Sequence, residues 1–379
     1  MEGRAVVVYL NGEYWGIHYL RDRFDKEYLH QLYGINPSRI SLMEVALGDE
    51  PKFSFASPKD SYSQDATKQY NRLLREAMAC KDCAQYNHYE KFYDMQNFID
   101  YFIFELHFSN LDWLNNNINI WRYDNTLVAR NPELSRHFTP GQDGRFRFHL
   151  FDLDGAFTVK STTPEEATRS AVTTAYGDMI NEYFPFRNLF NCPTFQENYF
   201  NRYANLLNTT LNTDLIFEEL DALINENELE MPNLIERWKE YTSPTGTKFP
   251  QSMDEWYYNI ELIKTFLTHR TDGMRTKTIE KFIDDSLQMQ MIELKVNIHP
   301  QNAGYIKIHD THITSDSMPF TGLYFPAYAI NVEAIANKGY QFIRWEGDAG
   351  ANDINNQKIR LNLNQNYQLT AIFEKNSLF

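Results

Sequence analysis

The sequence predicts an α+β protein in two parts: a mixed domain over residues 1–288 with a helical second half, and a small all-β domain over residues 289–379. Three observations lead to this prediction. Strand-like apolar runs surround an Asn-Gly turn near the start of the chain. Helical spacing dominates over residues 66–111 and 180–285. From about Met291 onward, short alternating segments recur between Gly, Asn and Pro turns, without any helical pattern.

Composition limits the classes of protein that fit the chain. Hydrophobic residues make up 42% and aromatic residues 15%, which is enough to fill sizeable cores. There are 36 basic and 51 acidic residues, and the resulting net charge of −15 argues against nucleic acid or anionic lipid as the main partner. No apolar stretch reaches the roughly 18–20 residues of a membrane helix, so we expect no membrane span. The first residues do not resemble a signal peptide, so we expect a leader to have been removed.

The first elements are defined by local turn and cap signals. Residues 5–20 are expected to form a β-hairpin, because two apolar, strand-like runs surround Asn11-Gly12, the strongest two-residue turn signal. A helix is predicted over residues 25–33, where apolar residues have helical spacing and a glycine follows. A short strand is predicted over residues 40–45.

A central helix and two strands come next. Residues 98–108 are apolar nearly all round, which predicts a helix buried in the middle of the domain. Residues 115–122 are expected to form a strand, and residues 145–151 alternate like its partner. The segment between these strands is rich in Asn and Pro, and we expect it to be a polar loop.

Three cysteines are too few for a complete disulfide framework. Cys80 and Cys83 have the spacing of half a zinc site, but the sequence has no second Cys-x-x-Cys pair. We therefore expect these residues and Cys192 to be structural or incidental thiols.

Acidic and amide side chains follow the central helix and its neighbouring strands. Asp112 comes just after the helix, Asn117 lies five positions later, and Asp152 and Asp154 come directly after the partner strand. Protein kinases use the same ordered parts: a catalytic-loop Asp, a metal-binding Asn five positions on, and a metal-binding Asp after the next hairpin. Asn116 is an equally placed amide, so the choice of Asn117 rests on the spacing.

The chemistry of phosphoryl transfer requires these residue types. Mg²⁺ prefers hard oxygen ligands, usually one or two carboxylates together with phosphate oxygens and water. A separate carboxylate must orient the attacking hydroxyl. Asp112 fits the orienting role, Asn117 and Asp152 fit the metal roles, and Asp154 would be an additional ligand. Each residue alone is more simply a cap or a strand-end turn, whereas two acidic clusters at the ends of buried elements favour a function.

The same segments resemble the motifs of the spore-coat protein H (CotH) kinase-like family. The resemblance is carried by residues 11–25 around the hairpin, by residues 112–122 and by residues 151–157, and it covers roughly residues 1–285. It implies an atypical protein-kinase-like fold that transfers phosphate from ATP to protein Ser/Thr. It also implies ATP and Mg²⁺ as cofactors, with Mn²⁺ or Ca²⁺ as alternatives, and the roles given above for the four site residues.

Two departures from the family pattern affect the nucleotide side of the site, to which we assign Asp22 and Asn116. Asp22 stands where the family usually has Glu, and the shorter acid reaches less far toward a phosphate-binding Lys. Family members also carry β structure and such a Lys upstream of the hairpin, and Lys26 is a poor substitute because it lies on the following helix. We therefore expect an N-terminally truncated β part, an incomplete nucleotide lid and weak ATP turnover.

The C-terminal domain is similar to the small β repeats of bacterial surface proteins, the InlB B-repeat-like modules. The resemblance is carried by glycine-aromatic strings that begin at Gly304, Gly322 and Gly339, the last of which ends with Trp345. Its aromatic residues are most simply core, and carbohydrate stacking on Trp345 is the alternative. Such a module implies an exported, extracellular or cell-surface protein.

Three functions stay open from the sequence. The first is an exported, Mg²⁺-dependent CotH-like kinase, active or degenerate, acting on a protein substrate. The second is a nucleotide-sugar glycosyltransferase that uses Asp152-x-Asp154 as its metal motif. The third is a non-catalytic, exported cell-surface binding protein, a scaffold or adhesin in which the acidic cluster binds Ca²⁺ or no ligand at all.

Overall fold

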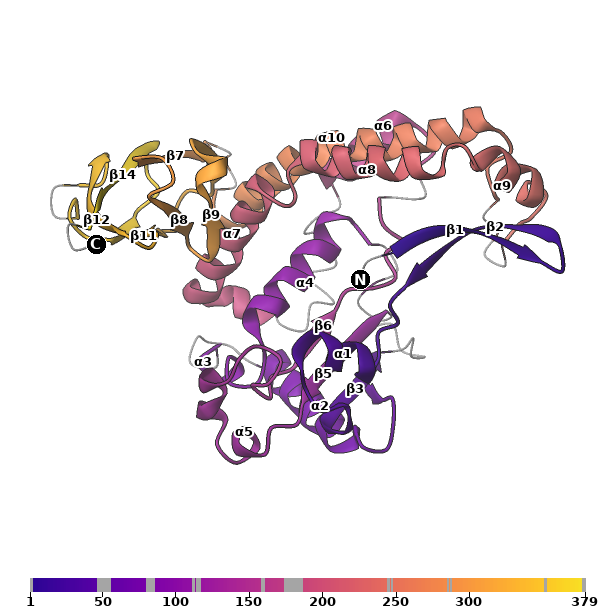
Figure 1. The fold of residues 1–379 in the computed structure, drawn as a ribbon, viewed down its shortest axis with the longest axis horizontal. Helices are drawn as coiled ribbons and strands as arrows, with labels where there is room; N and C mark the ends of the chain where they lie inside the picture. Colours follow the sequence, from indigo (N-terminus) through magenta and orange to yellow (C-terminus); the bar gives the residue numbers. More distant parts are fainter. Residues whose placement is uncertain are drawn as a thin grey trace.

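The structure is a computed structural model that describes residues 3–45, 56–79, 86–110, 113, 117–157, 161–173, 187–243, 246, 248–284, 286, 288–350 and 353–376. Figure 1 shows a long β-hairpin on one side, a mixed helical and strand body in the middle, and an all-β unit at the opposite end. Helices α8 and α10 run along the molecule between these two ends. The mixed composition followed by an all-β region confirms the α+β prediction.

The N-terminal hairpin consists of β1 (Gly3–Leu10) and β2 (Glu13–Arg21), paired antiparallel. Its turn residues Asn11 and Gly12 have φ values of 53° and 86°, the left-handed backbone that an Asn-Gly turn supplies without strain. The next helix, α1 (Lys26–Tyr33), is capped by the Asp25 side chain at its start and by Gly34 at its end. Both elements confirm the sequence predictions.

The body contains a four-stranded antiparallel sheet with the strand order β4-β3-β5-β6. Its strands are β3 (Ile40–Val45), β4 (Ser57–Pro58), β5 (Ile118–Tyr123) and β6 (Arg147–His149). The predicted pairing of the two strands that follow the central helix is therefore confirmed, although β6 is shorter than expected.

The described residues of the stretch for which helical spacing was predicted form α2 (Gln64–Ala79), α3 (Tyr86–Tyr89) and α4 (Met95–His107). Helix α4 is buried on nearly every side, as the apolar sequence predicted, and its phenylalanines pack against β6.

The segment between β5 and β6 corrects the prediction of a plain loop. It contains α5 (Thr126–Arg130) and the 3₁₀ helix η3 (Pro132–His137). Asn125 and Asn131 start these helices, because each side chain accepts hydrogen bonds from main-chain N–H groups of the first turn. The Asn and Pro residues that suggested a loop are therefore helix-start signals here.

Within the described ranges, the helical second half of the body contains four longer helices and two short ones. Pro232 lies in the first turn of α9, where a missing N–H costs nothing. No helix in the described part of the chain is long and apolar enough to cross a membrane. The elements are α6 (Pro164–Thr173), η5 (Arg187–Asn191), α7 (Pro193–Asn208), α8 (Thr213–Asn227), α9 (Met231–Trp238) and α10 (Met253–Phe282).

The C-terminal unit contains two four-stranded sheets, in the orders β10-β7-β14-β12 and β13-β11-β8-β9. Trp345 is fully buried and donates from Nε1 to the main-chain oxygen of Asn356, which confirms the core interpretation and excludes stacking on a carbohydrate. The strands are β7 (Ile292–His299), β8 (Gly304–Ile308), β9 (Thr311–Ile313), β10 (Phe320–Tyr324), β11 (Ile330–Ala336), β12 (Tyr340–Gly347), β13 (Lys358–Leu361) and β14 (Tyr367–Lys375).

One hydrophobic core extends from the body through α7 into the C-terminal unit. Phe200 of α7 stacks on Tyr328 with ring centroids 4.8 Å apart and meets Phe325 at 5.8 Å. The domain boundary between residues 288 and 289 stays a prediction. In the described residues after it, the regular elements are strands and one short 3₁₀ helix.

Candidate metal and nucleotide site

The candidate site lies where β5 begins and β6 ends. Asn119 of β5 pairs with His149 of β6 in an antiparallel register, so the chain before β5 and the chain after β6 leave the sheet at the same end. Asn117 directly precedes β5, and Asp152 comes three residues after the end of β6. The sheet therefore brings two predicted metal residues to the same end.

Asn117 and Asp152 have unusual backbone conformations. Their φ values are 57° and 58°, in the left-handed region that costs most residues energy but that Asn and Asp adopt more readily than others. Asp152 and Asp154 are both solvent-exposed, so their carboxylates are accessible to a ligand. These exposed oxygen groups lie directly beyond the ends of buried strands.

A direct contact joins the loop after α4 to the loop after β6. The Asn110 side chain is fully buried and donates from Nδ2 to the main-chain oxygen of Asp152, at 3.3 Å. The main-chain N–H of Phe157 donates to the oxygen of Phe108, at 2.8 Å. The two loops that carry the predicted site residues are therefore joined at Asp152 and again five residues later, at Phe157.

Helix α4 supports these loops through polar side chains on its buried surface. Glu105, which is 1% exposed, accepts at Oε2 from Asn110 Nδ2 at 2.9 Å. One turn earlier, the hydroxyl of Tyr101 accepts from Nε1 of Trp113 at 2.8 Å. Trp113 directly follows Asp112 in the sequence, so the helix anchors the chain next to that residue.

Two of the predicted residues, Asp112 and Asn116, lie outside the described residues, as do Cys80 and Cys83. Among the residues that are described, no group of three His, Cys, Asp or Glu side chains could hold a metal. Asn117 is not among these four residue types, but its amide oxygen could also be a metal ligand. Asp152, Asp154 and Asn117 supply hard oxygen atoms, which suit Mg²⁺.

Asp22 is exposed in the short segment between β2 and α1. Two residues later, the ring of Phe24 stacks on His149 with centroids 3.7 Å apart and an interplanar angle of 6°. His149 in turn faces Phe151 at 6.3 Å. This stack brings the Asp22 segment to the same end of the sheet.

Lys26 is engaged elsewhere. Its Nζ lies 2.6 Å from Oδ2 of Asp60, in an ion pair beside α1. This placement agrees with the prediction that Lys26 is a poor substitute for a phosphate-binding lysine.

His107 lies at the end of α4 and is completely buried. Its Nδ1 lies 3.1 Å from the hydroxyl of Tyr203. Burial, together with the positive charges of Arg270 and Arg275, holds the pKa of His107 well below its usual value. The ring is therefore neutral at physiological pH and belongs to the core, as the sequence indicated.

Sequence reasoning missed the residue that holds the end of α4. Arg270 of α10 is fully buried, and its guanidinium donates to the main-chain oxygens of Leu106 and His107 and, at 2.9 Å, to that of Ala171. A buried guanidinium in this position adds a charged donor to the carbonyl groups at the end of the helix. Only the fold reveals this role, because 163 residues separate Arg270 from His107.

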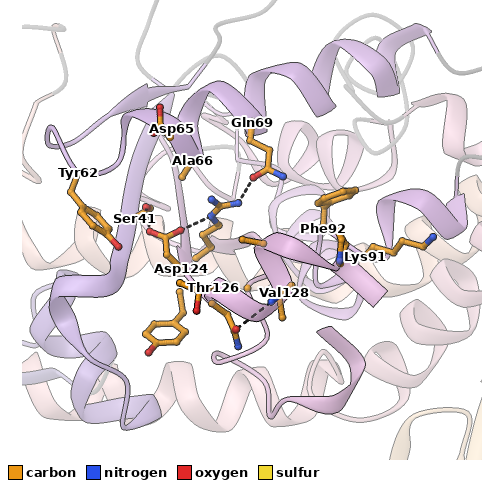
Figure 2. Close-up of a pocket in the computed structure, with 16 residues that line it drawn as sticks. Ser41, Tyr62, Asp65, Ala66, Gln69, Lys91, Phe92, Asp124, Thr126 and Val128 are labelled. Carbon is orange, nitrogen blue, oxygen red and sulfur yellow. Dashed lines mark hydrogen bonds and ion pairs between the residues drawn. The ribbon is translucent and has the colours of Figure 1, made fainter. Parts of the chain in front are cut away.

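A separate pocket of about 310 Å³ lies at the opposite end of β5 (Figure 2). Arg122 pairs there with Asp124 at 2.9 Å, and the Ser41 hydroxyl donates to the same carboxylate at 2.7 Å. This pocket is roughly 17 Å along the strand from Asn117, at about 3.3 Å per residue. We therefore do not count the pocket as part of the predicted site.

The fold and the loop geometry define a mixed α+β protein with hard oxygen donors at one end of its central sheet. Comparison with protein families identifies the chain more closely, because residues 2–274 match the family described as CotH kinase protein. This match covers well over half of the 379 residues. The chain therefore belongs to the CotH kinase family.

The C-terminal unit has its own match. Residues 315–377 match the family described as divergent InlB B-repeat domain. No curated protein matches the chain. Both family resemblances stated from the sequence are therefore confirmed.

Proposed function

We propose that this protein is an exported CotH-type kinase that transfers a phosphoryl group from ATP to Ser or Thr of a protein, with Mg²⁺. Asp112 would orient the attacking hydroxyl, Asn117 and Asp152 would hold the metal, and Asp154 would assist. The observation that carries this proposal is the contact between Asn110 Nδ2 and the main-chain oxygen of Asp152, which joins the two loops. Family membership supports the reaction class.

The donor set fits a hard divalent cation. Asp152 and Asp154 are exposed carboxylate residues, and the half-buried Asn117, which directly precedes β5, would add an amide oxygen. Mn²⁺ and Ca²⁺ accept the same kinds of ligand, so we expect some exchange among these ions. When bound, the metal would offset negative charge on the transferred phosphoryl group.

We also propose that the body has a kinase-like fold and that the nucleotide lies beside the metal. Asp22 and Asn116 would lie on the nucleotide side, since the stack of Phe24 on His149 holds the Asp22 segment beside the end of β6. Lys26 is paired with Asp60, so it does not supply the cation that a triphosphate needs. We therefore expect nucleotide binding to be easier to detect than turnover.

Export is supported by two observations. The C-terminal unit belongs to a family of bacterial repeats, and Cys192 is disulfide-bonded. Disulfides persist in oxidising compartments, which favours an extracellular or cell-surface location. The disulfide also corrects the expectation of incidental thiols for this cysteine.

The proposal is tested by calorimetry of ATP binding in the presence and absence of Mg²⁺. Wild-type protein is expected to bind only with the metal, and Asp152→Ala is expected to abolish binding. Asp112→Ala is expected to keep binding and to lose transfer of labelled phosphate to protein. Asp272→Ala is a matched control, because that carboxylate is 86% exposed on α10. Wild-type affinity in Asp152→Ala would contradict the assignment.

The alternatives give different results in the same assay. A non-catalytic surface protein would bind no nucleotide but would still bind its partner. A glycosyltransferase would bind a UDP-sugar, but the sheet of the body is entirely antiparallel, and the one parallel pair of named strands in the described ranges is β7 with β14. The parallel βαβ series of a nucleotide-sugar enzyme thus finds no support here.

A further inference from the structure

One face of α7 binds the main chain of the C-terminal β unit through three asparagines. Each asparagine donates from Nδ2 to a carbonyl oxygen of that unit, and each of the three distances is 2.9 Å. The pairs are Asn201 with Ala329, Asn205 with Ile308, and Asn208 with Leu323. Their spacing of four and three residues places these side chains on one side of the helix.

Asparagine is a poor choice inside a helix unless its side chain has a specific partner. Asn201 and Asn205 are each 1% exposed, and burying an amide costs free energy when its hydrogen bonds are not replaced. The Tyr324 hydroxyl donates to Asn205 Oδ1 at 3.0 Å, and the Leu323 N–H donates to Asn208 Oδ1 at 3.0 Å. This face of α7 is therefore specific for the backbone of the β unit.

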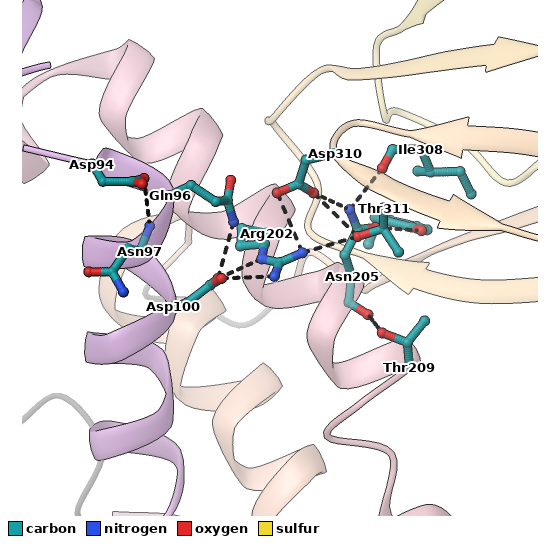
Figure 3. A network of polar contacts seen from close by, with 11 residues as sticks. Asp94, Gln96, Asn97, Asp100, Arg202, Asn205, Thr209, Ile308, Asp310 and Thr311 are labelled. Carbon is teal, nitrogen blue, oxygen red and sulfur yellow. Dashed lines mark hydrogen bonds and ion pairs between the residues drawn. The ribbon is translucent and has the colours of Figure 1, made fainter. Parts of the chain in front are cut away.

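A second contact extends from the β unit to α4, as Figure 3 shows. Arg202 of α7 donates from Nε and Nη2 to the two carboxylate oxygens of Asp100, at 2.6 and 2.9 Å. Its Nη1 lies 3.5 Å from Oδ2 of Asp310 and donates to the Thr311 hydroxyl at 3.3 Å. One guanidinium thus joins α4 to the turn between β8 and β9.

Asp100, the α4 residue that Arg202 contacts, lies close to the residues of the same helix that hold the loops of the candidate site. Asp100 precedes Tyr101, which anchors Trp113, and lies just over one turn before Glu105, which holds Asn110. A shift of α4 at Asp100 would move both of these contacts.

We propose that the C-terminal β unit is a brace for α4, and that Arg202 is the positioning residue through which it fixes the helix leading into the candidate site. Removing the Arg202 contacts would loosen the β8–β9 turn and the end of α4 together. The part of this inference that concerns nucleotide rests on the proposed function.

Hydrogen exchange of the full-length chain, followed by mass spectrometry, tests the brace. Arg202→Met keeps much of the side-chain volume and removes the guanidinium. We expect about tenfold faster exchange both in the β8–β9 turn and in the last turn of α4, because partly buried charged groups lose their partners. Exchange in the β1–β2 hairpin is expected to stay unchanged. Faster exchange confined to residues 289–376, with α4 unaffected, would overturn the proposal.

Two further variants make the result interpretable. Asn198→Ala is the matched control for Asn205→Ala, because Asn198 also lies on α7 but donates to Tyr86 of the body. Only Asn205→Ala is expected to raise exchange in both regions. If Arg202→Met fails to fold, Asp310→Asn is used in its place, because it weakens the contact between Arg202 and the β8–β9 turn and keeps the guanidinium. Unchanged exchange of α4 in Asp310→Asn would also overturn the proposal.

A nucleotide measurement separates this inference from the proposed function. We expect Arg202→Met to weaken Mg²⁺–ADP binding several-fold, and Asn198→Ala to leave it unchanged. Failure of the wild-type protein to bind Mg²⁺–ADP would contradict the proposed function, while the exchange experiment would still decide whether the β unit braces α4. Wild-type affinity in folded Arg202→Met would refute the positioning role.

Discussion

The candidate site depends on buried polar side chains that hold its loops in place. Glu105 and Asn110 are almost completely buried, and their contact supports the main chain at Asp152. A buried carboxylate is costly unless it is hydrogen-bonded, so such a residue is informative in an apolar helix. These side chains connect the core of the body to the exposed residues that would contact a ligand.

Glu105 provides the first prediction. Glu105→Leu removes the nearer of the two acceptors of the buried Asn110 amide and leaves only the main-chain oxygen of Asp152, so the free energy of unfolding is expected to fall by about 1–3 kcal/mol. Glu105→Gln retains an acceptor oxygen and is expected to lose less. Denaturant unfolding of both variants measures the difference, and equal stability of the Leu variant and the wild type would count against the role of this contact.

His149 provides a prediction about pH. Burial is the main cause that lowers its pKa to about 4, whereas an unfolded chain has the usual value of about 6.5. The unfolded state therefore binds more protons between pH 6.5 and pH 4, and stability falls as the pH falls through this range. His149→Phe keeps the stack with Phe24 and is expected to remove about 1–2 kcal/mol of this loss, allowing for the ring's partial exposure.

Thermal unfolding of wild type and His149→Phe at a series of pH values measures this effect. The melting temperature of the wild type is expected to fall relative to that of His149→Phe as the pH falls from 6.5 to 4. Parallel curves over that range would show that His149 does not contribute to the pH dependence.

The sequence suggests candidate ligand residues more readily than the residues that support them. Asp152, Asp154 and Asn117 could be proposed from the sequence because acidic and amide side chains at the ends of apolar elements form a recognisable pattern. Glu105 also carried a signal, as the one carboxylate in the stretch 101–108 of an apolar helix. Arg270 carried none, because its partners are main-chain carbonyls more than 90 residues away.

At the scale of elements, predictions succeeded where a local signal fixed the backbone. Asn11-Gly12 set the hairpin turn, and Asp25 and Gly34 set the limits of α1. The segment between β5 and β6 was predicted wrongly, because Asn and Pro start helices as readily as they form turns. The position of the hairpin against α9 could not be predicted, since it depends on residues more than 200 positions apart.

Gly16 tests how closely the hairpin packs against α9. Its φ is +129°, and an added Cβ would lie 2.6 Å from Leu234 Cδ1 and 3.3 Å from Trp238 Nε1. Trp238 donates from that atom to the main-chain oxygen of Trp15, at 2.9 Å. Gly16→Ala is therefore expected to displace α9 and to lower the free energy of unfolding by about 2–3 kcal/mol.

Gly12→Ala is the control for this prediction. Gly12 also has a positive φ, of +86°, but an added Cβ would meet nothing within 4 Å. Its cost is expected to be about 1 kcal/mol, from the backbone alone. Equal losses of stability in the two variants would show that contact with α9 contributes nothing.

At the scale of the whole molecule, the body and the β unit share one hydrophobic core and a set of polar contacts across α7. The all-β character of the C-terminal unit could be predicted from alternating strands. Its packing against α7 could not, because the asparagines of α7 are recognisable as contacts only when the strands opposite them are in place. The two family matches cover the body and the β unit separately, whereas the structure shows that the two parts pack against each other.

Cys192 gives a prediction for the whole molecule. This cysteine is buried and disulfide-bonded. Cys192→Ser is expected to lower the free energy of unfolding by about 2–5 kcal/mol, the usual effect of losing a native disulfide. A reducing agent is expected to lower the melting temperature of the wild type but not that of the variant. An unchanged melting temperature of the reduced wild type would contradict a structural role for this bond.

The central claim is that the loop after α4 and the loop after β6 share one metal–nucleotide site. The most direct test is an anomalous difference map from crystals of the full chain soaked with Mn²⁺ and a non-hydrolysable ATP analogue. We predict one main peak within coordination distance of an Asp152 carboxylate oxygen and of the Asn117 amide oxygen, with the analogue's phosphates beside it. Nucleotide bound with its metal at another place, with no density at Asp152, would contradict the account.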